Sequence, residues 1–186
     1  MRNEMTIREL TVPVSASRRR TRAVPAFLSM VILSGCAEST LAPSPTVRLV
    51  EAGWSFGFCL GTCNGVLSVD GDDLAYEVTS RTGDQVLGEA RGELTSSGSA
   101  RLEELLSALP ATLQEQYGCP DCADAGAAYV VVERGTSDRR SDYEYPNPPQ
   151  ELAALDAFLR DVMDALGSCR ASADLGIEGS CVPVPR

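Results

Sequence analysis

The sequence predicts an α+β domain in which two main helices pack on one face of an antiparallel sheet of about six strands, cross-linked by disulfides. Runs of alternating polar and apolar residues recur at hairpin spacing, which is typical of antiparallel strands. Two segments carry leucines at helical spacing. Six cysteines lie beyond residue 46, and their even number is compatible with disulfide pairs. The predicted order of elements is β-β-β-β-α-β-β-α.

Four strands are expected in the first half of the domain. The first covers residues 47–56 and is followed by a glycine-rich turn over 57–65. The next two strands are joined by the acidic hairpin at 70–73, and a weaker, glycine-containing strand covers 85–95. The hairpin carboxylates suggest calcium binding. The loop lacks the glycine and the closing glutamate of an EF-hand, however, so a plain turn is favoured.

The first helix is expected to begin after Ser99, a good N-cap, and to end before Pro110. Its apolar stripe at positions i, i+3, i+4 and i+7 comprises Leu102, Leu105, Leu106 and Leu109. We expect a short helical piece over 111–117 and a loop over 118–126. An apolar strand over 127–133 comes next.

A further strand alternates through residues 141–145, and the last helix follows it. Asn147 is the expected N-cap, with prolines at the first helical positions, and Gly167 is expected to end the helix. The buried stripe of this helix comprises Leu152, Leu155, Leu159, Val162, Met163 and Leu166. A tail with Cys169 and Cys181 closes the domain.

The first 35 residues have the layout of an export signal. Arginines at 18–22 precede an apolar run over 23–35, which is too short to span a bilayer because a span needs about 20 residues. The run leads into Leu-Ser-Gly-Cys at 33–36, which resembles the lipobox of bacterial lipoproteins. The resemblance implies cleavage after residue 35 and a lipid on Cys36. An ordinary secretory signal with a chance cysteine is the alternative.

The chain therefore divides into a signal peptide (1–35), the lipidated Cys36 with a Ser/Pro tether (36–46), and a single domain (47–186). Acyl chains on Cys36, palmitate among them, would hold the protein to a membrane of the cell envelope. In a bacterium with two membranes, alanine after the lipidated cysteine suggests the outer membrane, by analogy with known lipoproteins. Translation begins at Met1 or Met5.

The mature domain is strongly acidic. Removing residues 1–35 takes six of the 16 basic and two of the 26 acidic residues, which leaves 10 against 24 and a formal charge of −14. Such a surface repels phosphate backbones, so no nucleic-acid partner is expected. The chain contains no histidine and no lysine. This excludes Ser-His-Asp and Cys-His catalysis, histidine-ligated zinc, a P-loop lysine and a Schiff base. We assign no catalytic residue and no cofactor.

The six cysteines of the domain are the residues that say most about its possible function. We favour three local disulfides, which are Cys59–Cys63, Cys119–Cys122 and Cys169–Cys181. The rival arrangement joins the first pair to the second. The C-x-x-C spacing of the second pair is also that of thiol oxidoreductases, but no helix is predicted after it to activate a thiol, and Arg134 is the nearest arginine. A four-cysteine zinc site is compatible with the spacings, although an oxidising compartment disfavours it.

The turn at 58–63, Phe-Cys-Leu-Gly-Thr-Cys, together with the strand and Asp-Gly hairpin after it, resembles a family of uncharacterised bacterial lipoprotein domains. Some of them also carry a Gly-Cys-Pro-Asp-Cys-Ala-Asp loop like residues 118–124. The similarity covers about residues 47–166 and departs at Asn64, where many members have proline. It implies a shared α+β fold and supports a disulfide within the turn. It brings no known activity.

These observations favour a membrane-anchored, non-catalytic binding or structural module with an envelope protein or glycan as partner. Trp54, Phe56 and Phe58 beside the first turn are a candidate recognition surface, although we favour their packing in the core. The alternative function is a thiol-disulfide redox lipoprotein that uses Cys119 and Cys122.

Overall fold

The structure is a computed structural model that describes residues 46–120, 122, 126–179 and 181–184. The predicted signal peptide (1–35), the lipidation site Cys36 and the tether up to residue 45 lie outside the described residues. Among the helices that are described, none has both the length and the apolar character needed to cross a membrane.

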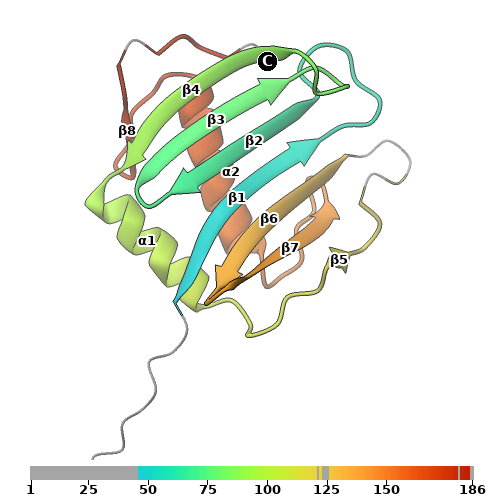
Figure 1. Ribbon diagram of the computed structural model, residues 1–186, viewed down its shortest axis with the longest axis vertical. Helices are drawn as coiled ribbons and strands as arrows, with labels where there is room; N and C mark the ends of the chain where they lie inside the picture. The colour runs from blue at the N-terminus through green and yellow to red at the C-terminus, as the bar shows by residue number, and fades with distance from the viewer. Residues whose placement is uncertain (1–45, 121, 123–125, 180, 185–186) are drawn as a thin grey trace, which may run out of the picture. The chain divides into compact units, whose positions relative to one another are not determined.

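A mixed sheet forms one layer of the domain, and two helices form the other (Figure 1). The strands are β1 (Val47–Ser55), β2 (Asn64–Asp70), β3 (Asp73–Thr79), β4 (Val86–Leu94), β5 (Gln116–Tyr117), β6 (Ala127–Arg134), β7 (Ser137–Glu144) and β8 (Leu175–Ile177). Their order across the sheet is β5-β7-β6-β1-β2-β3-β4-β8. Neighbouring pairs of the described strands are antiparallel except β5 and β7, which are parallel. The α+β class and the six main strands are therefore confirmed, and the two short edge strands are additional.

The first helix, α1 (Ser96–Ser107), begins earlier than predicted. Thr95 is its N-cap, and the Thr95 hydroxyl accepts a 3.2 Å hydrogen bond from the Gly98 N–H. The prediction that Ser99 caps this helix was wrong. Ser99 lies inside the first turn, where its hydroxyl donates a 2.6 Å hydrogen bond to Oδ1 of Asp72 in the β2–β3 hairpin. Gly98 lies in this first turn, where the backbone of Asp174 comes so close that a side chain at position 98 would clash with it.

The segment before β6 is not helical, so the helical piece expected over 111–117 was also wrong. Residues 116–117 form β5, because Asp142 and Tyr143 of β7 offer a strand edge for them to pair with. An edge pairing of two residues leaves no periodic signal in the sequence.

The second helix, α2 (Ala153–Gly167), begins six residues after the predicted cap Asn147. Leu152 is its N-cap residue and makes no side-chain capping bond, so burial of Leu152 anchors this end instead. At the other end Cys169 adopts the left-handed conformation, with φ of 53°. The N–H groups of Cys169 and Arg170 reach back to the helix carbonyls, as in a Schellman motif. The helix therefore ends at Gly167 as predicted, although the residue in the left-handed conformation is Cys169 rather than the glycine.

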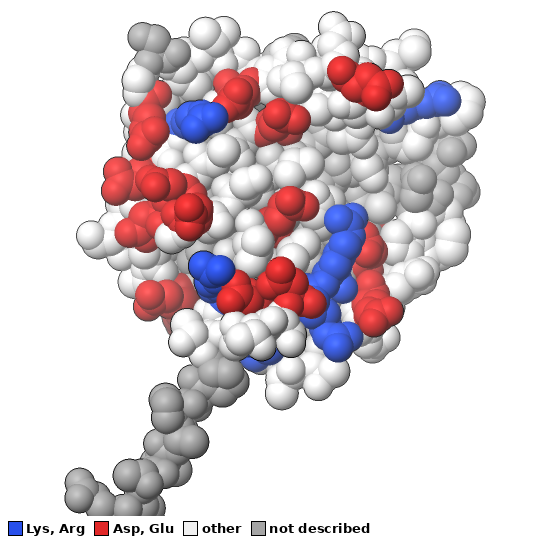
Figure 2. Space-filling model, in the orientation of Figure 1, with Lys and Arg blue, Asp and Glu red and all other residues white. Residues whose placement is uncertain are grey.

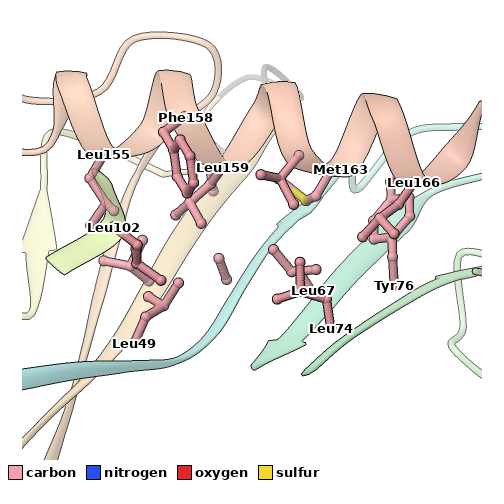
Figure 3. Packing of buried hydrophobic residues seen from close by; sticks show 14 of the residues in the cluster. Leu49, Leu67, Leu74, Tyr76, Leu102, Leu155, Phe158, Leu159, Met163 and Leu166 are labelled. Carbon is pink, nitrogen blue, oxygen red and sulfur yellow. The ribbon is translucent and has the colours of Figure 1, made fainter. Parts of the chain in front are cut away.

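The hydrophobic core lies between the helices and one face of the sheet (Figure 3). Along α2, the predicted apolar stripe is buried throughout, and Figure 3 shows Leu155, Leu159 and Met163 pointing toward the sheet. Leu49 and Leu67 meet them from β1 and β2. Each fully buried side chain of this size contributes about 1.5–3 kcal/mol. This layer fixes α2 across the sheet and so sets the space between the end of α2 and the sheet.

The other face of the sheet carries charges of both signs and no helix (Figures 1 and 2). Near its centre the Tyr129 ring lies over Gly53, where a Cβ would be 2.7 Å from the ring. The Tyr129 hydroxyl donates a 2.8 Å hydrogen bond to Glu51, and the Arg140 guanidinium lies 3.5 Å from the ring centre. Burial raises the pKa of Tyr129 most, and the neighbouring Glu51 raises it further. The Tyr129 side chain is thus held by partners from β1 and β7.

Candidate functional site

A cleft of about 310 Å³ opens between the C-terminal half of α2 and the sheet, where β1 ends. Trp54, near the end of β1, faces this cleft, and its partner across the strands is Gly65 of β2. A Cβ at Gly65 would lie 2.5 Å from the indole nitrogen, so the indole fits here because residue 65 is a glycine. Gly167, at the end of α2, also lines the cleft. Gly65 thus makes room for the indole, and Gly167 forms part of the cleft wall.

Aromatic side chains form most of the cleft wall. The ring centres of Trp54 and Phe56 are 5.4 Å apart, and those of Phe56 and Tyr145 are 5.0 Å apart with nearly perpendicular planes. Tyr76 adds a fourth ring, which lies beneath the C-terminal part of α2 (Figure 3). Trp54, Phe56 and Tyr145 are all half-buried. The expectation that the three aromatic residues pack in the core therefore holds only in part: Trp54 is partly buried against the core, Phe56 is half-buried, and Phe58 is exposed.

Tyr76 and Trp54 line the cleft together, and the Tyr76 phenol is a titratable group of the wall. Burial raises the pKa of Tyr76, a hydrogen bond with the indole lowers it, and the nearby carboxylate of Asp164 raises it further. The net effect is a raised pKa. The phenol therefore keeps its proton in neutral solution and is a neutral group in the wall.

Two charged side chains of the described residues line the cleft, and both come from α2: Arg160 and Asp164. Arg160 donates hydrogen bonds of 2.7 and 3.1 Å to the two carboxylate oxygens of Asp156. Its guanidinium also lies 4.2 Å from the centre of the Tyr145 ring. Burial lowers the pKa of Arg160, but its bonds and attraction to Asp156 outweigh this and raise it. Asp164, one turn further along, is exposed, and no ion pair of the described residues includes it.

A disulfide turn borders the cleft. Cys59 and Cys63 are bonded, with Cα atoms 5.7 Å apart, and the Phe56 N–H donates a 2.8 Å hydrogen bond to the Cys63 carbonyl. The tip of this turn is apolar and exposed: Phe58 has 80 % and Leu60 101 % of its surface accessible. Phe58 is therefore separate from the cleft, although it was grouped with Trp54 and Phe56 in the sequence.

The second disulfide joins Cys119 to Cys122, with Cα atoms 5.4 Å apart. Both residues are exposed, and neither lies in one of the described α-helices. The Cys119 N–H donates a 2.9 Å hydrogen bond to a carboxylate oxygen of Glu144 at the end of β7. A neighbouring carboxylate disfavours the thiolate form that thiol–disulfide exchange requires. Residues 121 and 123–125 of this loop lie outside the described part of the chain.

The third disulfide joins Cys169 to Cys181, with Cα atoms 5.6 Å apart. It holds the tail against the end of α2, where the Val184 N–H donates a 2.8 Å hydrogen bond to the Gly167 carbonyl. Val184 is buried and lines the cleft. All three bonds follow the local pairing favoured from the sequence, and this one also builds part of the cleft wall.

In the described part of the chain, no group of three or more cysteine, aspartate or glutamate side chains is placed to hold a metal ion. The first two cysteine pairs, which a zinc site would share, are each closed as a disulfide. In the acidic hairpin, the Asp72 carboxylate accepts its bond from Ser99 and so connects the hairpin to α1.

Sequence reasoning missed three of the cleft residues, which are Tyr145, Arg160 and Asp164. One signal was present: Asp156, Arg160 and Asp164 are four residues apart, which places them on one side of a helix. Nothing in the sequence indicated that this side of α2 would meet the end of β1.

Fold and site together define an α+β domain whose helical layer leaves an aromatic cleft at one end of a disulfide-linked sheet. No family model, no curated protein and no solved structure matches the chain. The resemblance of residues 58–63 and 118–124 to bacterial lipoprotein domains stays a prediction.

Proposed function

We propose that the protein is a lipoprotein of the bacterial cell envelope, anchored through Cys36, and that its domain is a non-catalytic binding module. The observation that carries this proposal is the cleft itself, a concave space with half-buried aromatic walls and two charged groups. Ligand sites typically combine a mostly apolar lining with a few fixed polar groups.

A ligand in the cleft would bury apolar surface of the aromatic residues, and this burial favours binding. Trp54, Phe56 and Tyr145 keep part of their apolar surface in water, and covering such surface is worth about 25 cal/mol per Å². The walls are also held in place beforehand: Arg160 by Asp156, and the tail by its disulfide. A ligand therefore orders few protein groups when it binds.

The place of the cleft suits an anchored protein. The tether would enter the domain at Val47, where β1 begins, and the cleft lies at the other end of this nine-residue strand. The strand spans about 26–30 Å, at about 3.3 Å per residue. The described domain thus begins at one end of β1 and has its cleft at the other.

Trp54 provides a direct test of binding because it is the only tryptophan in the chain. We expect a saturable change in its emission when soluble envelope components are added, including cell-wall glycan fragments, small organic solutes and peptides. Tyr145→Ala should weaken the response, whereas Tyr117→Ala, whose side chain lies outside the cleft, should preserve it. If no component changed the emission of Trp54, the cleft would not be a binding site.

Anchoring has a separate test. Replacing Cys36 by serine should abolish labelling with radioactive fatty acid and leave an unprocessed or soluble protein. A Cys36→Ser protein that still carried the label would contradict the lipoprotein assignment.

A redox function is the second candidate, because both cysteines of the Cys119–Cys122 pair are exposed and a protein substrate could reach them. Glu144 counts against it, since its carboxylate lies beside Cys119.

A further inference from the structure

The walls of the cleft are arranged to surround a compact group. The Trp54 and Phe56 planes are inclined by 49° and the Phe56 and Tyr145 planes by 85°, so the three rings line the cleft with different orientations. The face of an aromatic ring carries partial negative charge and attracts a cation within about 6 Å of its centre. Several inclined rings therefore favour a positively charged group over a neutral one of the same shape.

The charged side chains at the cleft also favour a cationic ligand. Arg160 is paired with Asp156 through two hydrogen bonds, so its charge is compensated within the wall. Asp164 has no such partner among the described residues and is exposed beside the cleft. The uncompensated charge of the cleft is thus negative, in a chain whose formal charge is −10. An anionic ligand would find no free cation in the lining.

Arg160 itself shows that a ring of this wall holds a cation. Its guanidinium lies 4.2 Å from the centre of the Tyr145 ring. The same pairing recurs at Arg101 with Phe158 and at Arg140 with Tyr129, so cation–π contact is a repeated element of this domain.

We propose that the cleft binds an organic cation, an ammonium or guanidinium group attached to an apolar body. The aromatic rings would surround the charged head, and Asp164 would provide the opposite charge. This inference rests on the proposed binding function and specifies the chemistry of its ligand.

The test compares two probes of nearly equal shape, choline and 3,3-dimethylbutan-1-ol, in which a neutral tert-butyl group replaces the trimethylammonium group. Each is titrated against the full mature chain at constant ionic strength, with Trp54 emission as the readout. N-acetylglucosamine and inorganic phosphate serve as neutral polar and anionic probes. We expect choline to bind at least about five-fold more tightly than its neutral counterpart.

Asp164→Asn should reduce choline affinity about five-fold and leave the affinity of the neutral alcohol unchanged. The matched control is Asp161→Asn, which makes the same change on the same helix at an exposed residue outside the cleft, and it should bind choline as the wild type does. Circular dichroism and thermal unfolding of both variants check that the fold is retained.

The outcomes separate this inference from the one on which it rests. Equal or tighter binding of the neutral alcohol, or binding of the sugar or phosphate in place of choline, would overturn the cation assignment while keeping the cleft as a binding site. A Trp54 signal unchanged by every probe would overturn the cation assignment, and the binding function would fall as well only if the envelope components also left the signal unchanged. Equal loss of choline affinity in Asp164→Asn and Asp161→Asn would show general electrostatics rather than a site, and would also overturn the assignment.

Discussion

The phenolic hydroxyl of Tyr143 on β7 donates a 2.7 Å hydrogen bond to Oδ1 of Asp156 on α2. Both residues are buried, with 2 % and 7 % of their surface exposed. A buried carboxylate is costly unless its oxygens accept hydrogen bonds, and Arg160 supplies the remaining donors. This group connects the sheet to α2 and fixes Arg160 in the cleft wall. The stability of the fold and the shape of the site therefore share one interaction.

Tyr143→Phe should lower the free energy of unfolding by about 1–2 kcal/mol, because the buried Asp156 loses one of its donors while Arg160 remains. Urea unfolding followed by circular dichroism measures this. Tyr117→Phe is the control, since the Tyr117 hydroxyl accepts an exposed hydrogen bond from the Gln114 N–H and should matter less. Unchanged stability in Tyr143→Phe would show that Arg160 alone satisfies the carboxylate.

The same tyrosine makes stability depend on pH in alkaline solution. Burial, and then the charge and hydrogen bond of Asp156, raise the pKa of Tyr143 above its ordinary value of 10.0. Below about pH 10 both states keep the proton; above it the unfolded chain loses its proton first, binds fewer protons than the folded chain, and becomes favoured. We expect the free energy of unfolding to fall as the pH rises above about 10, and less steeply in Tyr143→Phe. Identical slopes in the two proteins would contradict this.

Alternating and helical patterns in the sequence predicted the main strands and both helices, because apolar residues at those spacings must face one core. The first residue of each helix was harder to predict from the sequence. Thr95 caps α1 because the chain leaves β4 there, and Leu152 begins α2 through burial rather than through a side-chain cap. The first start uses a local hydrogen bond to the Gly98 N–H, whereas the second depends on tertiary contacts that local sequence does not encode.

Gly98 provides a test of such a contact. Alanine is favoured over glycine inside a helix by about 1 kcal/mol, but a Cβ at this position would lie 2.1 Å from the Asp174 carbonyl oxygen. The clash should dominate, and Gly98→Ala should destabilise the domain by about 1–3 kcal/mol. Gly167→Ala is the matched control, because its Cβ would meet the Tyr76 ring at an ordinary 3.5 Å, and it should be neutral or slightly stabilising. Thermal unfolding measures both, and a gain of stability in Gly98→Ala would refute the contact.

The candidate site was harder to predict than the fold. Trp54 and Phe56 were recognised as candidates, yet the sequence favoured placing them in the core. Their exposure depends on where α2 ends relative to β1, which is set by packing between segments about a hundred residues apart. Tyr145 lies just beyond β7, where the alternating pattern gives no indication of a cleft.

Removing the Cys169–Cys181 disulfide should destabilise the domain more than removing Cys59–Cys63. The first closes a separation of 12 residues and the second one of four, so in the entropic model they contribute about 3 and about 2 kcal/mol. Double serine variants compared by urea unfolding measure the order. Loss of the longer bond should also shift Trp54 emission to the red, because Val184 would no longer be held in the cleft wall. A reversed order of stability would indicate that strain or packing outweighs the chain entropy.

The Cys119–Cys122 disulfide should be inert as an oxidoreductase. The Glu144 carboxylate accepts a 2.9 Å hydrogen bond from the Cys119 N–H, and no ion pair among the described residues neutralises it. A negative charge beside a thiol disfavours the attacking thiolate. We therefore expect insulin reduction at background rates in the wild type and in the Cys119→Ser/Cys122→Ser variant.

Glu144→Gln isolates the electrostatic cause of this inertness. After reduction, its Cys119 should be alkylated several-fold faster than that of the wild type at the same pH, because the neutral amide no longer opposes the thiolate. Glu103→Gln, an exposed glutamate on α1, makes the same change far along the chain and should leave the alkylation rate unchanged. Both cysteines are exposed, so slow reaction cannot be attributed to burial. Insulin turnover in the wild type that disappeared in the double serine variant would instead favour the redox function over the binding module.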